Sequence, residues 1–320
     1  RRLAAPGAYG GGGRLRGEAN RRELMTQWDG HGLPPVAAER MRRFASTGLR
    51  TSLLTVPGAV GAQSVGFDPV GEVMGCIVQH IGWSGFGGCG YFGGVGMLGG
   101  FSGFGLGGGT VTSSGRAGLV GFGPYVDALY RGYGTALARM TEEAAAMGAD
   151  GVVGVRLSVS DLGNDNREFV ALGSAVRSRS RHRPTRVFST ELAGQDVAKL
   201  LQAGWVPCAI AYGISVAIRH DDWRTQRQSS WGAGNTEVSG YTELVAHVRA
   251  DARYRFDQQA RATGAEGAIV SSMGLQIRAI EPAENHRDHV AESTVFGTAL
   301  ASFHRGSTAP TRSLTILPLR

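Results

Sequence analysis

The chain has 320 residues, of which 42% are hydrophobic, so it can build the packed cores of about two domains and is not a disordered protein. The formal net charge is +7, but Lys199 is the only lysine. An arginine bias of this kind reflects genome base composition as readily as a nucleic-acid partner. Three scattered cysteines, Cys76, Cys89 and Cys208, exclude a disulfide framework and fit a reducing cytoplasm.

The start of the chain predicts no folded element. Residues 1–24 are rich in Arg and Gly and lack a periodic apolar face, which predicts a disordered extension. Met25 opens a more ordinary sequence, so we expect translation to begin there, and no export signal is recognisable. The most apolar run, from Val206 to Ile218, is shorter than the roughly twenty residues of a membrane helix and predicts a buried strand. We therefore expect a cytoplasmic protein without a membrane partner.

A long helix is predicted from about Tyr125, because apolar residues recur there at spacings of three and four. Gly148 stands where a left-handed residue would end that helix. The next residues alternate between apolar and polar or small, which predicts a half-buried strand. A polar turn, GNDNRE, leads to a further strand over 168–176. The positions expected on one face of the first strand are Val153, Val155, Leu157 and Val159.

The same pattern occurs again at an offset of 116 residues, which takes Tyr125 to Tyr241 and Gly148 to Gly264. The later strand EFVALGSAV (168–176) matches ESTVFGTAL (292–300). The opening strand GFDPVGEVMGCIV, from Gly66, matches GWVPCAIAYGISV, from Gly204. The sequence therefore predicts two tandem β-α-β-β domains. In the second, the face matching the first strand comprises Ile269, Ser271, Met273, Leu275 and Ile277.

These repeats divide the chain into six parts. The expected division is an extension (1–24), an N-terminal segment (25–65), a first domain (66–178) with a Gly-rich insert (84–118), a basic linker (179–187), a second domain (188–304) and a C-terminal tail (305–320).

The motifs VGEVMG, GADGVVGVRL and EFVALGSAV, with GAEGAIV and TVFGTAL as their second copies, resemble the YbjQ-like family of heavy-metal-binding proteins. The resemblance covers about residues 66–177 and 188–304. It implies an α+β fold in which a long helix packs on a small antiparallel sheet (dodecin-like), and assembly into a pentameric ring. Because this chain is a fused tandem, the simplest closed arrangement is five chains forming two stacked rings.

The Gly-rich insert contains a GxGxxG match at Gly85, Gly87 and Gly90. No helix begins there and no acidic residue follows at the spacing that holds a ribose, so the match does not indicate dinucleotide binding. The composition instead predicts disorder, or a flexible loop, dotted with aromatic residues, that covers a ring surface or self-associates. Cys89, within it, is a thiol that could bind soft metal or oxidise.

The tightest metal-ligand cluster is AENHRDHVAE, which carries His286 and His289 beside three acidic residues. Two histidines three positions apart can share a divalent ion if a third ligand is present. The alternative is a solvated turn between strands. The first copy has only GNDNRE at this place, so a metal site would not be a property of the fold. Cys76 and Cys208 are expected to be small buried hydrophobes.

Three further polar features stand out in the sequence. The motif HDDW (220–223) sets a histidine beside two carboxylates, but no nucleophile, base and orienting residue recur together, and the motif is read as a turn or a subunit contact. Glu72 lies among apolar residues on what is expected to be a buried face, where it needs a partner such as an arginine across a subunit boundary. The linker arginines suit a solvated edge better than nucleic acid, because no aromatic platform accompanies them. They are Arg177, Arg179, Arg181, Arg183 and Arg186.

The sequence therefore predicts a non-catalytic, homo-oligomeric binding or scaffold protein whose ligand it does not identify. The alternative is a protein that binds or senses zinc or a soft metal through Cys89, His286 and His289. Binding of nucleic acid or an acidic partner through the Arg-rich linker is a third reading.

Overall fold

The computed structural model describes residues 28, 32–47, 51–81, 111–113, 122–181, 183–283 and 286–303. The expectations for residues 1–24, for Met25, for the glycines of the insert, for Cys89 and for the tail 305–320 lie outside these ranges. So does the side chain of His286, although its backbone is described.

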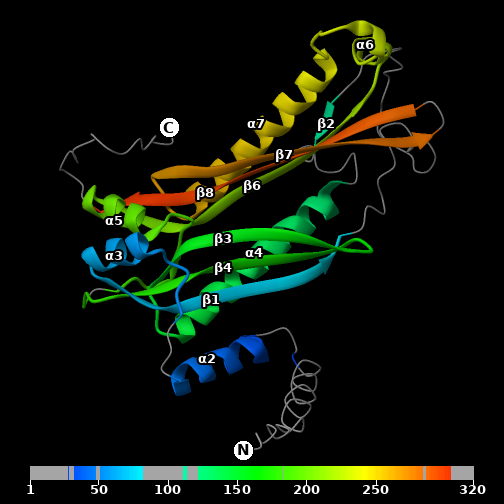
Figure 1. Cartoon of the computed structure of the whole chain (residues 1–320). Coiled ribbons are helices and arrows are strands. Elements are labelled where there is room, and N and C mark those ends of the chain that lie inside the picture. Colours follow the sequence, from blue (N-terminus) through cyan, green and yellow to red (C-terminus); the bar gives the residue numbers. More distant parts are fainter. Residues whose placement is uncertain are drawn as a thin grey trace, which may run out of the picture.

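Two sheets, each accompanied by one long helix, make up the described part of the chain (Figure 1). The first sheet has the strand order β1-β4-β3-β5 and the second β2-β6-β8-β7. Neighbouring strands are antiparallel, except that β5 pairs in parallel with β3. The α+β class predicted from the sequence is confirmed.

The strands of the first sheet are β1 (Phe67–His80), β3 (Gly151–Gly163), β4 (Asn166–Ser178) and β5 (Phe188–Ser189), and those of the second are β2 (Val111–Ser113), β6 (Trp205–His220), β7 (Gly267–Ala283) and β8 (His286–Ser302). The long helices are α4 (Phe122–Ala146) and α7 (Ser239–Ala262). The short ones are α2 (Pro35–Thr47), α3 (Val56–Ser64), α5 (Gly194–Gln202), α6 (Trp223–Gln228) and a 3-10 turn (Trp231–Ala233). We call residues 51–178 the first half and residues 188–303 the second half.

The elements stack in the order first sheet, α4, second sheet, α7. Val73 of β1 packs against Met140 of α4, and Ala211 of β6 packs against Phe256 of α7. We call the side of the first sheet that packs on α4, and the side of the second sheet that packs on α7, the inner faces. The opposite sides are the outer faces. The outer face of the second sheet rests on α4, where the ring of Tyr133 lies 5.0 Å from that of Phe296. One hydrophobic core therefore joins the two halves.

The predicted helix and turn signals are confirmed. Gly148 ends α4 with φ 70°, and Gly264 follows α7 with φ 79°. Asn164 and Asp165, with φ 52° and 58°, form the two-residue turn between β3 and β4, a conformation that asparagine and aspartate tolerate. The apolar run predicted to be a strand forms β6, most of which is buried. No helix within the described ranges is long and apolar enough to cross a membrane.

The same contact between strand and helix occurs in both halves. A Cβ atom on Gly75 would overlap the carbonyl oxygen of Ala136 and lie 2.6 Å from the nitrogen of Met140. A Cβ atom on Gly213 would overlap the carbonyl oxygen of Ala252 and lie 2.5 Å from the nitrogen of Phe256. Glycine at these positions lets the helix backbone lie directly on the strand.

A β-bulge changes which residues of β3 share a face. The register shifts between Val153 and Arg156, and Gly154 has φ 64°. Val153 packs with Leu54 on the outer side, whereas Val155 joins the inner core. The prediction that the alternating residues share one face is therefore wrong at Val153, because an inserted residue reverses the alternation.

The second half shifts register at the aligned place, between Val270 and Ser272. Ala268 and Leu275 both pack beside residues of α7, so they share the inner face. In an unbroken strand, residues an odd number of positions apart would lie on opposite faces. The face predicted from unbroken alternation is wrong here for the same reason.

Other expectations need correction. Residues 111–113, assigned to the Gly-rich insert, form β2 on the edge of β6. The residues of β1 that are buried most deeply are Gly71, Val73 and Gly75, so Glu72 lies half-exposed on the outer face and not on the helix-covered one. Cys76 and Cys208 are half-buried. Helices α3 and α5, which precede the opening strand of each half, were not predicted.

A polar cluster joins the halves beside the shared core. The hydroxyl of Tyr125, on α4, donates to Glu292 Oε2 at 2.6 Å and accepts from Arg167 Nη1 at 3.1 Å. Arg278 Nη2 lies 3.6 Å from the same carboxylate oxygen. Burial, reinforced by the charge of Glu292, raises the pKa of Tyr125 to about 12.

This cluster predicts a loss of stability in alkali. A tyrosine whose folded-state pKa exceeds its unfolded pKa of 10.0 contributes stability that is complete below pH 10 and is lost as the pH rises through about 12. Tyr125→Phe removes that contribution, so its free energy of unfolding should fall less than that of the wild type between about pH 10 and 12. Denaturant titrations across this range measure the difference. Parallel losses in both proteins would contradict the assignment.

Candidate functional site at the end of the second sheet

Two polar motifs that are far apart in the sequence meet at one end of the second sheet. In the pairing of β6 with β8, His220 lies opposite Asp288 and Arg219 lies opposite His289. The HDDW motif and the predicted metal cluster therefore belong to one polar strand end. Sequence alone did not bring them together, because the antiparallel register that aligns them is a tertiary feature.

The first histidine pair lies on the outer face of the sheet. His220 Nδ1 is 2.9 Å from Asp288 Oδ1. The carboxylate of Asp288 is fully buried, whereas the side chain of His220 is 37% exposed. The carboxylate thus holds one ring nitrogen of a histidine that is partly open to solvent.

The second histidine pair lies on the inner face, beside α7. His289 Nδ1 is 3.0 Å from Asp221 Oδ1, and the hydroxyl of Tyr241 donates to Asp221 Oδ2 at 3.1 Å. The rings of Tyr241 and His289 are 4.4 Å apart. Burial first, and then the charge of Asp221, raise the pKa of Tyr241, so the tyrosine remains a hydrogen-bond donor.

Both imidazoles are bound through Nδ1 to a carboxylate, an arrangement that also orients metal-binding histidines. The two pairs lie on opposite faces of the sheet, so they do not converge on one ion. Within the described ranges no group of three or more His, Cys, Asp or Glu side chains could hold a metal. Because the side chain of His286 and all of Cys89 lie outside those ranges, the metal site stays a prediction.

A small helical cap (residues 221–238) closes this end of the sheet. Asp222 Oδ1 accepts from the backbone nitrogen of Thr225 at 2.8 Å and so begins α6. Arg219, nearly buried, bridges to Glu243 of α7 and lies 3.6 Å from Asp222. Arg219 thus ties the cap to the strand, and Gln228, which accepts from the backbone nitrogen and the hydroxyl of Ser239, ties it to the start of α7.

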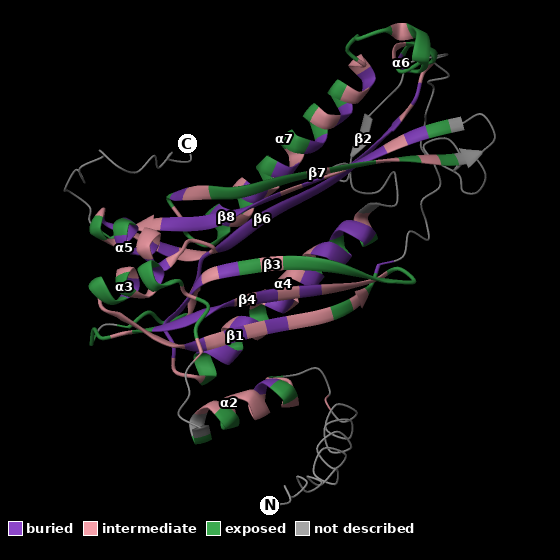
Figure 2. Cartoon of the chain, viewed as in Figure 1, coloured by how far each residue is buried: buried purple, intermediate pink, exposed green. Residues whose placement is uncertain are grey.

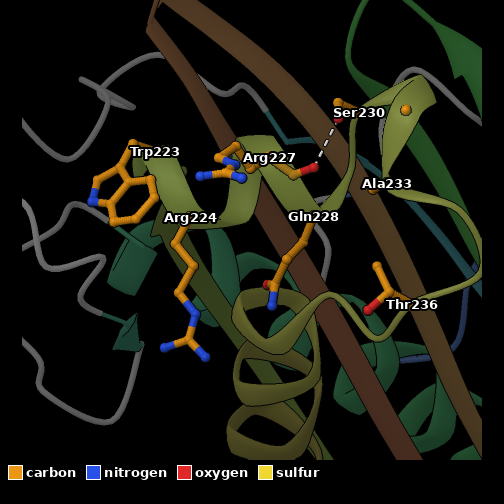
Figure 3. Close-up of a pocket in the computed structure, with 8 residues that line it drawn as sticks. Trp223, Arg224, Arg227, Gln228, Ser230, Ala233 and Thr236 are labelled. Carbon is orange, nitrogen blue, oxygen red and sulfur yellow. Dashed lines mark hydrogen bonds between the residues drawn. The ribbon is translucent and has the colours of Figure 1, made fainter.

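The cap presents an open hollow of about 490 Å³ to the surface (Figure 3). In Figure 3, Trp223 and Arg224 project from α6, and Ser230 donates to the carbonyl oxygen of Arg227 at 2.8 Å. Trp223 is 64% exposed and Trp231 fully exposed. Exposed tryptophan beside arginine is the composition that protein-binding surfaces favour. The hollow is lined by Trp223, Arg224, Arg227, Gln228, Ser230, Gly232, Ala233 and Thr236.

The arginines of the predicted linker take largely structural roles. Arg177 and Arg183 donate to carbonyl oxygens at the C-terminal end of α4, where the helix dipole favours positive charge. Arg183 also pairs with Asp150, and Arg179 with Asp68. Because these arginines already bind groups of the protein itself, fewer of them are left to contact the phosphates of a nucleic acid than the sequence suggests.

One buried acid was missed by the sequence reading. Glu143 of α4 is fully buried and accepts from Arg40 of α2 and, at 3.0 Å, from the backbone nitrogen of Met74. In the second half Gln259, at the aligned position, accepts from the backbone nitrogen of Tyr212. The alignment of the two halves places Glu143 opposite Gln259, and both side chains can accept hydrogen bonds. That match was the signal that could have predicted a shared role for the two residues.

Together these features define a two-sheet α+β protein whose polar end carries two carboxylate-bound histidines and an exposed aromatic cap. A family model described as "Putative heavy-metal-binding" (YbjQ_1) matches residues 115–179. An encapsulin nanocompartment protein of Mycobacterium tuberculosis is 31% identical over 247 residues, which cover 74% of this chain and 81% of the relative. The chain belongs to the YbjQ-like (UPF0145) family.

Other relatives match a smaller part of the chain. A UPF0145 protein of Halorubrum lacusprofundi is 51% identical over 41 residues, or 13% of this chain and 39% of the relative. One of Vibrio campbellii is 38% identical over 53 residues, or 17% of this chain and 51% of the relative. The mycobacterial match, at 247 residues, is longer than either half of this chain, so it extends over both.

Proposed function

We propose that this chain is a non-catalytic scaffold or binding protein, built from two tandem YbjQ-like domains, that associates with an encapsulin nanocompartment. The observation that carries the proposal is the similarity to the mycobacterial encapsulin nanocompartment protein over 81% of that relative. The likeness spans both halves, so it concerns the whole architecture and not one shared motif.

The cap supplies a surface suited to such an association. Trp223 and Trp231 are exposed on one short segment with Arg224 and Arg227. Tryptophan and arginine contribute most to binding where a partner desolvates them. The segment that carries these side chains is tied to the strand end through Arg219 with Asp222, and to α7 through Ser239 with Gln228. An ordered backbone reduces the entropy lost on docking.

Co-production of the full chain with an encapsulin shell protein from the same genome tests the proposal. We expect the chain to sediment with intact shells, and Trp223→Ala/Trp231→Ala to reduce the bound fraction at least about tenfold, because loss of each anchor costs more than about 1 kcal/mol. Leu162→Ala, which trims another exposed apolar side chain, is the control and should bind as the wild type does.

Two outcomes would count against this function. The first is a wild-type chain that sediments separately from purified shells at micromolar concentration. The second is turnover, by the purified chain, of a substrate that depends on His220 or His289, which would replace the scaffold reading with an enzymatic one. Elemental analysis of the same preparation tests the alternative metal-binding reading, which predicts a stoichiometric ion that is lost on replacing His289.

A further inference from the structure

The cap (residues 221–238) carries two arginines whose charge is not neutralised by a neighbouring carboxylate. Arg224 and Arg227 are both exposed, and both line the hollow of about 490 Å³. Neither guanidinium group forms an ion pair within the part of the chain that the structure describes. The aspartates of the cap are engaged elsewhere, because Asp221 binds His289 and Asp222 accepts the first hydrogen bond of α6. The hollow is therefore positively charged.

The start of α7 adds to this charge. Gln228, which lines the hollow, accepts from the backbone nitrogen and the hydroxyl of Ser239, the first residue of α7. The first turn of α7 holds no acidic residue, so the partial positive charge of the helix end adds to that of the arginines. Glu237, just before the helix, is exposed, but it accepts from Thr242 and does not line the hollow. Both sources of charge favour an anionic partner.

Exposed indole rings accompany the two arginines. Trp223 and Arg227 are four positions apart, which places them on one face of α6, and Figure 3 shows both projecting toward the same side. Trp231, fully exposed, directly precedes Gly232 of the lining. An indole ring contributes most to binding when a partner covers it with apolar groups. The surface thus suits a ligand that carries anionic and apolar groups next to one another.

An acidic peptide matches this surface better than a nucleic acid does. Guanidinium groups bind carboxylates in bidentate pairs, so two arginines are matched by two carboxylates. A single-stranded nucleic acid instead needs a positively charged groove that follows its backbone. The cap has two arginines and no lysine, and Arg219, at the end of β6, is nearly buried and bound to Glu243. The exposed carboxylates of Glu237 and Glu243 would repel a phosphate backbone that continued past the hollow.

We propose that the cap binds an acidic segment of the shell protein, whose carboxylates pair with Arg224 and Arg227 and whose apolar side chains cover the two exposed indole rings. This inference rests on the proposed function, because it names the chemistry of the surface that the cap meets on an encapsulin shell. In an extended segment, residues two positions apart share a face, so an acidic and an apolar side chain can reach the hollow together. The contact is partly electrostatic and weakens as salt rises.

A synthetic peptide tests this chemistry without the shell. The probe is a fluorescein-labelled repeat of Glu-Glu-Leu-Leu, in which each face of an extended chain carries glutamate and leucine in turn. A repeat of Gln-Gln-Leu-Leu is the matched peptide without charge. Fluorescence anisotropy with the full chain measures both dissociation constants. We expect the glutamate peptide to bind at least about tenfold more tightly at low salt, and this preference to fall as sodium chloride is added.

Charge variants of the full chain locate the binding site. Arg224→Glu/Arg227→Glu should raise Kd for the glutamate peptide at least about tenfold and should release the chain from shells. Arg224→Lys/Arg227→Lys, which keeps the charge but not the bidentate geometry, should lose less. Arg181→Glu/Arg186→Glu is the matched control, because it reverses two exposed linker arginines and changes the net charge equally. It should bind the peptide and the shells as the wild type does. All of the replaced side chains are exposed, so an unchanged Tm should confirm that each variant is folded.

The results distinguish this proposal from the proposed function. Equal affinity for the two peptides, or wild-type affinity of Arg224→Glu/Arg227→Glu for the glutamate peptide, would overturn the acidic partner. So would tighter binding of an oligothymidylate, which would identify the cap as a nucleic-acid site. A chain that binds the glutamate peptide through the two arginines but sediments apart from shells would confirm the acidic specificity and refute the shell as partner. Shell binding that the charge reversal leaves unchanged would support the proposed function and overturn this inference.

Discussion

Gly75→Ala is expected to destabilise the protein by about 3 kcal/mol or more, at the upper end of what overpacking costs. The added Cβ atom would overlap the carbonyl oxygen of Ala136 and come within 2.6 Å of the nitrogen of Met140. Both are helix backbone atoms, which cannot turn aside as a flexible side chain can. The strand and α4 must separate, and the separation opens the core around Val73.

Thermal unfolding followed by circular dichroism measures this effect, and a loss of about 3 kcal/mol lowers Tm by roughly 6–12 °C in a domain of this size. Gly213→Ala should behave in the same way, because its Cβ atom meets the aligned atoms of α7. Gly123→Ala is the control: nothing lies within 4 Å of its Cβ position, and alanine favours a helix. An unchanged Tm for both strand variants would show that the helix-to-strand contact is looser than described.

Glu143→Ala is expected to cost about 3 kcal/mol, because it removes a buried ion pair and leaves a backbone donor unsatisfied. Arg40 loses both carboxylate oxygens, and the backbone N–H of Met74 loses its acceptor. Helix α2 should also detach more easily, since Arg40 connects it to α4. Denaturant unfolding measures the stability, and limited proteolysis near α2 measures the detachment.

Glu143→Gln separates the two contributions of this side chain. Glutamine keeps an acceptor for Met74, as Gln259 does for Tyr212, but loses the charge that holds Arg40. Its cost should therefore be about half that of alanine. Glu142→Ala, which trims the exposed neighbour, should change stability by less than about 0.5 kcal/mol. Equal losses for the glutamine and alanine variants would show that only the charge matters.

Much of the helix-and-strand plan could be read from periodicity and glycine placement. The spacing of apolar residues predicts α4 and α7, and the glycines at 148 and 264 mark where they end. Repetition of the same pattern indicates two similar halves, and the matched contacts of Gly75 and Gly213 support that interpretation. These signals are local, because each depends on residues within one or two turns of the chain.

The candidate site was much less predictable. His289 and His220 were noticed separately. The partner of His220, Asp288, lies on the opposite strand, and the partner of His289, Asp221, directly follows the opposite strand. Cross-strand partners depend on the register of β6 with β8, and this register cannot be predicted from any short stretch of sequence. The cap was also missed, since Trp223 and Trp231 carry no periodic signal and become a surface only when α6 folds against α7.

By itself the sequence determined the α+β class, the long helices, the strand content and the YbjQ-like family, because periodicity, turn residues and motif likeness are properties of neighbouring residues. Only the tertiary structure decided that α4 lies between the sheets, that bulges reverse the faces of β3 and β7, and that Glu72 lies on an open face. Each of these features depends on which distant segments pack together and exclude water. A single inserted residue moves the following side chains of a strand to the opposite face, and a helix packed on one face decides which side chains are buried.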